Sequence, residues 1–163
     1  MKSDPDRLTR HTDTFQAGVF RPHGSMEMWI ESGPGGGTIY SVAQGPFNAE
    51  FLSAFLRARN DLMAKAGQQR LRAHILQMQR SMMASPDMLD EYRRLLGGLI
   101  SGGMVAEITA WVVGPDVEGR EFMLPLYTQV YRELNLPFAS FESVADAEAW
   151  VREQLREEAS PVG

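Results

Sequence analysis

The 163-residue sequence contains no cysteine, which excludes a disulfide scaffold, thiolate zinc sites, iron–sulfur clusters and a cysteine nucleophile. It also has no run of about 18 or more apolar residues, so we expect no helix that spans a bilayer. Residues 1–13 are charged and polar, which is unlike the apolar core of a signal peptide. These absences predict a cytoplasmic protein without a membrane partner.

Histidine is scarce, and the three present, His11, His23 and His74, show no spacing typical of metal ligands. The sequence also lacks a Gly-x-Ser-x-Gly nucleophile elbow and a Gly-Lys-Ser/Thr phosphate loop. We therefore expect no metal, no cofactor and no catalytic residues, and the prediction is that the protein is not an enzyme. An enzyme that uses scattered residues such as His74, Asp87 and Tyr127 is an open alternative, since function resides in sites carried by a fold.

The composition is that of an ordinary globular domain, with 44% hydrophobic and 23% charged residues. A net charge of −5 argues against a nucleic-acid partner. We expect a flexible leader over residues 1–24, a single domain over residues 25–158 and a tail over residues 159–163.

Residue patterns predict a series of strands and helices after the leader. The strands are expected over residues 25–31, 38–43, 71–78, 106–113 and 138–141, with the apolar run 106–113 nearest the centre of the sheet. Helices are expected from Asn48 to Gly67, from Ser85 to Gly102, over residues 122–134 and from Ser143 onward. In a helix over 122–134, Pro125 either lies in the first turn, where the missing N–H does no harm, or kinks the helix.

Several helix starts carry recognisable capping residues. Asn48 is expected as the N-cap of the first helix, with Phe47 packing against Leu52. Ser85, followed by a proline and an aspartate, is expected as the N-cap of the second helix. Ser143 and Asp146 resemble a capping box for the last helix.

The order of elements is β-β-α-β-α-β-α-β-α, which predicts an α/β protein. The glycine-rich break at 33–37 separates two extended runs and indicates an antiparallel hairpin. Helices between the later strands indicate parallel pairing through right-handed crossovers. We therefore expect a mixed, mostly parallel five-stranded sheet with an N-terminal hairpin and about four helices.

Two short segments carry a family resemblance. Residues 45–50, Gly-Pro-Phe-Asn-Ala-Glu, and the closing stretch with Phe141 and Trp150 resemble the STAS (SpoIIAA-like) domains, most of all their small uncharacterised bacterial members. The match covers about residues 26–155. The CRAL-TRIO lipid-exchange fold resembles the same architecture. The first resemblance implies a regulatory, protein-binding module, and the second implies a carrier of a small apolar ligand or lipid.

In regulatory STAS proteins, a serine in an Asp-Ser-Ser-Gly turn after the third strand is phosphorylated. The matching segment of this chain is 79–87, which offers Ser81 and Ser85 but lacks that motif. Whether either serine is phosphorylated stays open.

Methionines concentrate where the third predicted strand ends, the edge at which open α/β sheets commonly bind ligands. The leading hypothesis is a non-enzymatic interaction module whose partner contacts Ser81, Met82, Met83, Ser85, Asp87 and Met88. The alternative is an apolar ligand pocket that includes Met78, Tyr127 and Tyr131. A homodimer is compatible with the sequence, and no sequence feature decides it.

Overall fold

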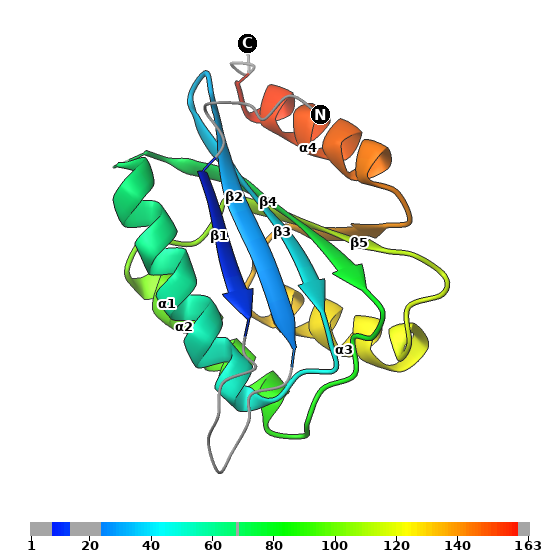
Figure 1. Ribbon diagram of the computed structural model, residues 1–163. Coiled ribbons are helices and arrows are strands. Elements are labelled where there is room, and N and C mark those ends of the chain that lie inside the picture. Colours follow the sequence, from blue (N-terminus) through cyan, green and yellow to red (C-terminus); the bar gives the residue numbers. More distant parts are fainter. Residues whose placement is uncertain (1–7, 14–23, 68, 160–163) are drawn as a thin grey trace, which may run out of the picture.

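The computed structural model describes residues 8–13, 24–67 and 69–159, and in these residues the chain forms one sheet and four helices (Figure 1). The strands are β1 (Leu8–Asp13), β2 (Ser25–Gly33), β3 (Gly36–Gln44), β4 (Leu71–Gln79), β5 (Ile108–Val113) and β6 (Phe138–Phe141). The helices are α1 (Ala49–Ala66), α2 (Met88–Ser101), α3 (Arg120–Glu133) and α4 (Val144–Ala159). None of these helices is both long and apolar enough to cross a membrane.

The strands lie side by side in the order in which they occur along the chain. β1, β2 and β3 pair antiparallel, and β3 to β6 pair parallel, with a helix in each crossover. The predicted α/β class and the order of elements from β2 to α4 are confirmed. β5 is an interior strand, although it lies next to the edge strand β6 and not at the centre.

β1 was not predicted, and it adds a sixth strand within the segment expected to be a leader. It pairs with β2 from Leu8 opposite Ile30 to Asp13 opposite Ser25. Its sequence, Leu-Thr-Arg-His-Thr-Asp, has one apolar residue and therefore no hydrophobic alternation to reveal a strand. Residues 1–7 and 14–23 of the expected leader, and residues 160–163 of the expected tail, lie outside the described residues.

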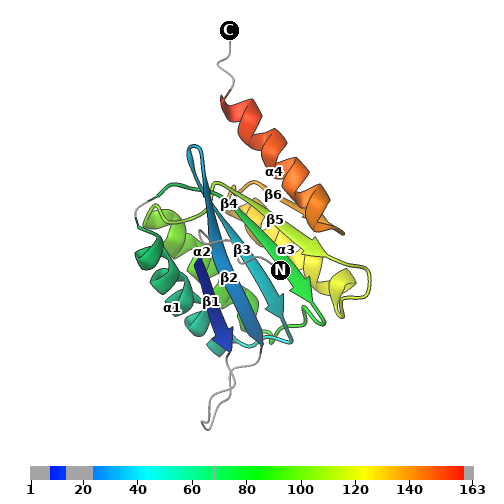
Figure 2. The ribbon, with the colours of Figure 1, turned by 45° about the horizontal axis from the view of Figure 1, so that its top comes forward.

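The helices are divided unequally between the two faces of the sheet. α1, α2 and α3 lie against one face, and α4 alone covers the other (Figure 2). The face with three helices holds the larger core, which includes Met28, Leu62 and Trp111. The face under α4 holds a small aliphatic core around Ala110 and Val151. Any interior cavity of useful size is therefore expected beneath α1, α2 and α3.

Two of the three predicted helix caps are confirmed. Asn48 accepts a hydrogen bond from the backbone N–H of Phe51 at 3.2 Å, and the hydroxyl of Ser143 accepts one from Asp146 at 3.2 Å. The Ser85 prediction is wrong, because its hydroxyl donates to the carboxylate of Asp87 at 2.6 Å and α2 begins only at Met88. Ser85 instead opens a turn, in which its carbonyl accepts from the N–H of Met88.

The third helix begins earlier than predicted, at Arg120, after Gly119 in a left-handed conformation with φ of 80°. Pro125 therefore lies beyond the first turn and removes a helical hydrogen bond to Glu121. Both residues are exposed, so water can satisfy the free carbonyl. The helix tolerates the proline for that reason.

A candidate ligand cavity

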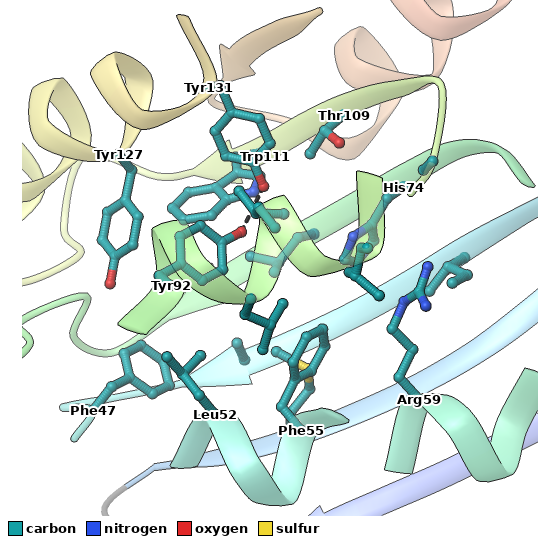
Figure 3. A pocket seen from close by; sticks show the side chains of 18 of the residues that line it. Phe47, Leu52, Phe55, Arg59, His74, Tyr92, Thr109, Trp111, Tyr127 and Tyr131 are labelled. Atoms are coloured by element: carbon teal, nitrogen blue, oxygen red, sulfur yellow. Dashed lines mark hydrogen bonds between the residues drawn. The ribbon is translucent and has the colours of Figure 1, made fainter. Parts of the chain in front are cut away.

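A cavity of about 50 Å³ lies between the sheet and helices α1, α2 and α3 (Figure 3). α2 lies between α1 and α3, and its side chains Met88, Tyr92 and Leu96 line the cavity opposite the strands. One buried water needs roughly 10–15 Å³ of such space, so the cavity has room for a few waters or a few carbon atoms. A larger ligand needs lining side chains, or one of the helices that cover the cavity, to move.

Aromatic rings form the wall of the cavity near α3. Trp111 of β5 packs against Tyr127 with ring centres 4.8 Å apart, and Tyr92 of α2 meets Tyr127 edge-on at 5.4 Å. The hydroxyls of Tyr92 and Tyr131 form a 2.5 Å hydrogen bond. Burial raises the pKa of all three tyrosines, that of Tyr131 to about 12. These phenols therefore stay protonated near neutral pH and can donate hydrogen bonds.

The indole N–H of Trp111 is a buried donor in the same wall. It makes no hydrogen bond of good geometry within the described residues. It nevertheless lies close enough to the hydroxyl of Tyr131 to help stabilise that phenolate, which moderates the pKa increase caused by burial. A bent or long contact of this kind satisfies a donor only weakly. The cavity wall therefore contains a buried donor, the indole N–H of Trp111, that is only weakly satisfied.

Among the described residues, Arg59 of α1 is the one Lys or Arg that lines this cavity. Its side chain is 4% exposed, and its Nη2 donates to the backbone carbonyl of Met104. Its Nη1 is buried and has no hydrogen-bond partner among the described residues. Burial lowers the pKa of Arg59 to about 10, so the guanidinium is still charged at neutral pH. The cavity therefore contains a buried positive charge.

His74 of β4 lies on the same face of the sheet as Arg59 (Figure 3). Burial, together with the charge of Arg59, lowers the pKa of His74 to about 3. The imidazole is thus neutral at physiological pH, and its Nε2 shares a 2.8 Å hydrogen bond with the hydroxyl of Ser41 on β3. His74 is therefore a sheet-face residue whose ring is hydrogen-bonded.

The structure brings the three residues of the predicted apolar pocket together. Met78, Tyr127 and Tyr131 all line the cavity, and Met88 from the predicted methionine cluster does as well. Met82 does not line the cavity.

The predicted partner contact is only partly a surface, and this corrects the prediction. Ser81, Met82 and Met88 are each no more than 3% exposed, whereas Met83, Ser85 and Asp87 are accessible. The reason is that the segment after β4 is paired with two loops. Its backbone bonds include Met82 N–H to the carbonyl of Glu118, Gly45 N–H to the carbonyl of Ser81, and Phe47 N–H to the carbonyl of Met83. Buried in this way, Ser81 is not accessible to a kinase without local opening.

Sequence reasoning missed Arg59, although the sequence contains a signal for it. Phe51, Phe55 and Leu62 mark the apolar stripe of α1, and Arg59 falls four residues after Phe55, on the same side. A lone cation within an apolar stripe indicates a buried charge. We find no group of three or more His, Asp or Glu side chains within the described residues that could hold a metal ion.

Comparison with protein-family models, with curated proteins and with solved structures gave no significant match. The fold is therefore established by the arrangement of helices and strands alone. The resemblance to STAS and CRAL-TRIO domains stays a prediction, and the function must be argued from the cavity and the surface.

Proposed function

We propose that the protein binds a small, mostly apolar molecule in the cavity beneath α2. The observation that carries this proposal is an interior space lined by aromatic and aliphatic side chains from four strands and three helices. Ligand sites commonly combine such a lining with a few polar groups that fix orientation. Here those groups are Arg59, His74 and the Tyr92–Tyr131 hydroxyl pair.

Binding without chemistry is part of this proposal. A general acid or base works best with a pKa near the working pH. Burial moves the pKa of His74 down to about 3 and those of the cavity tyrosines upward, away from neutrality. A cytoplasmic location is also part of the proposal, since a chain without cysteine suits a reducing compartment.

The test is to extract the purified protein with organic solvent, identify bound molecules by mass spectrometry, and titrate it with 1-hexanol and 2-phenylethanol. We expect a co-purified small molecule, or a rise in melting temperature that saturates with either alcohol. Ala106→Leu, which fills the cavity, should abolish that rise, whereas Ala145→Leu on the exposed side of α4 should preserve it. An empty extract together with no response to either alcohol would overturn the proposal.

A second candidate function, a regulatory interaction module of the STAS type, is favoured by a different observation. Phe122 is 77% exposed and Leu126, four residues later on the same side of α3, is 43% exposed. Met83, 38% exposed, lies against Gly119 at the start of that helix. Exposed apolar side chains that gather in one place commonly mark a protein interface.

This candidate includes a homodimer as the simplest partner. We expect the double variant Phe122→Ser, Leu126→Ser to lower self-association in sedimentation, or to lose a partner recovered from the native cell. Gln129→Ser, an exposed polar position on the same helix, is the control. A protein that is monomeric at high concentration and recovers no partner above background would remove this candidate.

A further inference from the structure

We propose that the ligand of the cavity carries a single carboxylate, which pairs with Arg59 while its apolar part points toward Trp111. This inference rests on the proposed ligand-binding function and specifies the chemical class of the ligand. It is carried by a buried guanidinium group that has a free Nη1 and no anionic partner within the described part of the chain.

Arg59 lies at one end of the cavity (Figure 3). Its side chain also borders an open surface groove that includes Gln69, Arg70 and Met104, where the parallel strands begin. A ligand that enters from this groove reaches Arg59 before it reaches the aromatic wall. A ligand that enters with its apolar tail first would therefore bring the tail to the aromatic wall and leave its charged head beside Arg59.

Within the described part of the chain, no acidic side chain competes with a ligand for Arg59. Of the residues that the structure describes, Glu107 is the one acid in the lining of the groove. Its carboxylate pairs with Arg70 and with Arg72, the latter at 3.3 Å. Arg59 makes no ion pair with any residue that the structure describes. Buried charges in proteins are normally paired, so an unpaired one implies a missing partner.

The free nitrogen of Arg59 and the size of the cavity indicate which kind of anion fits. Arg59 already uses Nη2 on the carbonyl of Met104, which leaves Nη1 as the free amino group. One amino group in a cavity of about 50 Å³ suits a small, singly charged carboxylate better than a bulkier phosphate. His74 adds no competing charge, since it is neutral, and the Trp111 N–H lies in the wall toward which the tail points.

The experiment measures the affinities of hexanoate, 1-hexanol and hexyl phosphate by calorimetry, using the full chain. Hexanoate and 1-hexanol share an apolar tail and differ in their head groups. We expect hexanoate to bind at least roughly tenfold more tightly than 1-hexanol, because a charge-assisted hydrogen bond in a dry site supplies the difference. Hexyl phosphate should bind more weakly than hexanoate.

Arg59→Met is the decisive variant, since it keeps the length of the side chain and removes the charge. We expect it to lose the preference for hexanoate and to keep the affinity for 1-hexanol. Arg57→Met removes a charge from the exposed side of the same helix and should change neither affinity. Arg59→Lys should restore part of the preference, and thermal unfolding of each variant shows that it is folded.

The outcomes separate this inference from the proposed function. If 1-hexanol binds as tightly as hexanoate, or if Arg59→Met keeps the preference, the carboxylate is wrong although the cavity binds ligands. If hexyl phosphate binds most tightly, the anion is a phosphate and the inference is wrong. If none of the three probes binds, the inference is wrong, whereas the proposed function is overturned only if the solvent extract is also empty and 2-phenylethanol gives no response.

Discussion

The two faces of the sheet are covered by cores that differ in size and in composition. Under α4, the core consists of short aliphatic side chains, namely Ala73, Ile75, Ile108, Ala110 and Val112 from the strands with Ala147 and Val151 from the helix. Under α1, α2 and α3, the core is larger and contains a cavity, a buried guanidinium and hydrogen-bonded hydroxyls. A close-packed apolar layer needs no further explanation, whereas buried polar groups beside a void point to a function.

β5 shows this difference within two neighbouring residues. The side chains of Trp111 and Val112 are both buried, and they point to opposite faces of the sheet. Trp111 contacts the rings of Tyr92, Tyr127 and other aromatics, whereas Val112 lies in the aliphatic core under α4. Substitutions at these positions therefore test the two faces separately.

The largest effect is expected for Trp111→Ala, which removes the centre of the aromatic wall. It should lower the free energy of unfolding by about 3–5 kcal/mol, while Val112→Ala should lower it by about 1–3 kcal/mol. Urea denaturation of both variants measures the difference. Equal losses would mean that the aromatic wall is loosely packed, contrary to its ring contacts.

The second effect concerns pH, and it belongs to the cavity face alone. The folded protein keeps His74 neutral down to a pKa of about 3, whereas an exposed histidine has a pKa of 6.5. Between these values the unfolded chain binds the extra proton, so stability falls as the pH is lowered. The loss from His74 approaches about 1.4 kcal/mol per pH unit, or about 2–3 kcal/mol between pH 6.5 and 4.5.

The measurement for this effect is a series of urea denaturations across that pH range, with His74→Gln beside the unmodified protein. The variant should show a flatter dependence, since its side chain does not titrate. Carboxylates contribute the same background to both proteins. Parallel curves would mean that His74 is protonated in the folded state, and hence that the cavity is wetter than the structure shows.

The third effect compares small-to-large changes on the two faces. Ala147 under α4 is completely buried among aliphatic side chains, so Ala147→Leu should cost about 1–3 kcal/mol by overpacking. Ala106 borders the cavity, so Ala106→Leu should cost less than about 1 kcal/mol, because its added atoms enter existing space. Thermal unfolding of Ala147→Leu and Ala106→Leu measures the two losses of stability. Equal losses would argue that the cavity does not exist in solution.

Much of the fold could be predicted from local patterns in the sequence. Helix starts are visible where a side chain caps the backbone, as at Asn48 and Ser143, and strands are visible where apolar residues alternate. Ser85 misled because the chain forms a turn there, in which the Ser85 carbonyl accepts from the N–H of Met88, and the helix starts only after Asp87. Local pattern also failed for β1, whose backbone pairing needs no apolar side chain.

The candidate site was harder to predict, because it depends on long-range packing. The sequence indicated Met78, Tyr127 and Tyr131, since all three lie on predicted apolar faces. It did not show that the segment containing Ser81 is buried by loops that are distant in the chain. Nor did it show that α2 lies between α1 and α3 and lines a cavity opposite the strands. Such facts follow from the assembled layers and not from any one segment.

The smallest effect concerns α2, the helix that covers the cavity and has no counterpart on the α4 face. Gly97 and Gly98 lie inside this helix, and a methyl group at either position would meet open space. Each glycine weakens the helix, so Gly97→Ala and Gly98→Ala should each raise the free energy of unfolding by up to about 1 kcal/mol. Gly67→Ala is the contrasting control, because Gly67 also faces open space but has a φ of 78°, which strains any other residue.

If α2 must move for a ligand to enter, the Gly97→Ala and Gly98→Ala proteins should also bind 1-hexanol more slowly in stopped-flow measurements, without a matching loss of affinity. If these variants are more stable but bind 1-hexanol at an unchanged rate, the ligand enters through the groove beside Arg59 without moving α2.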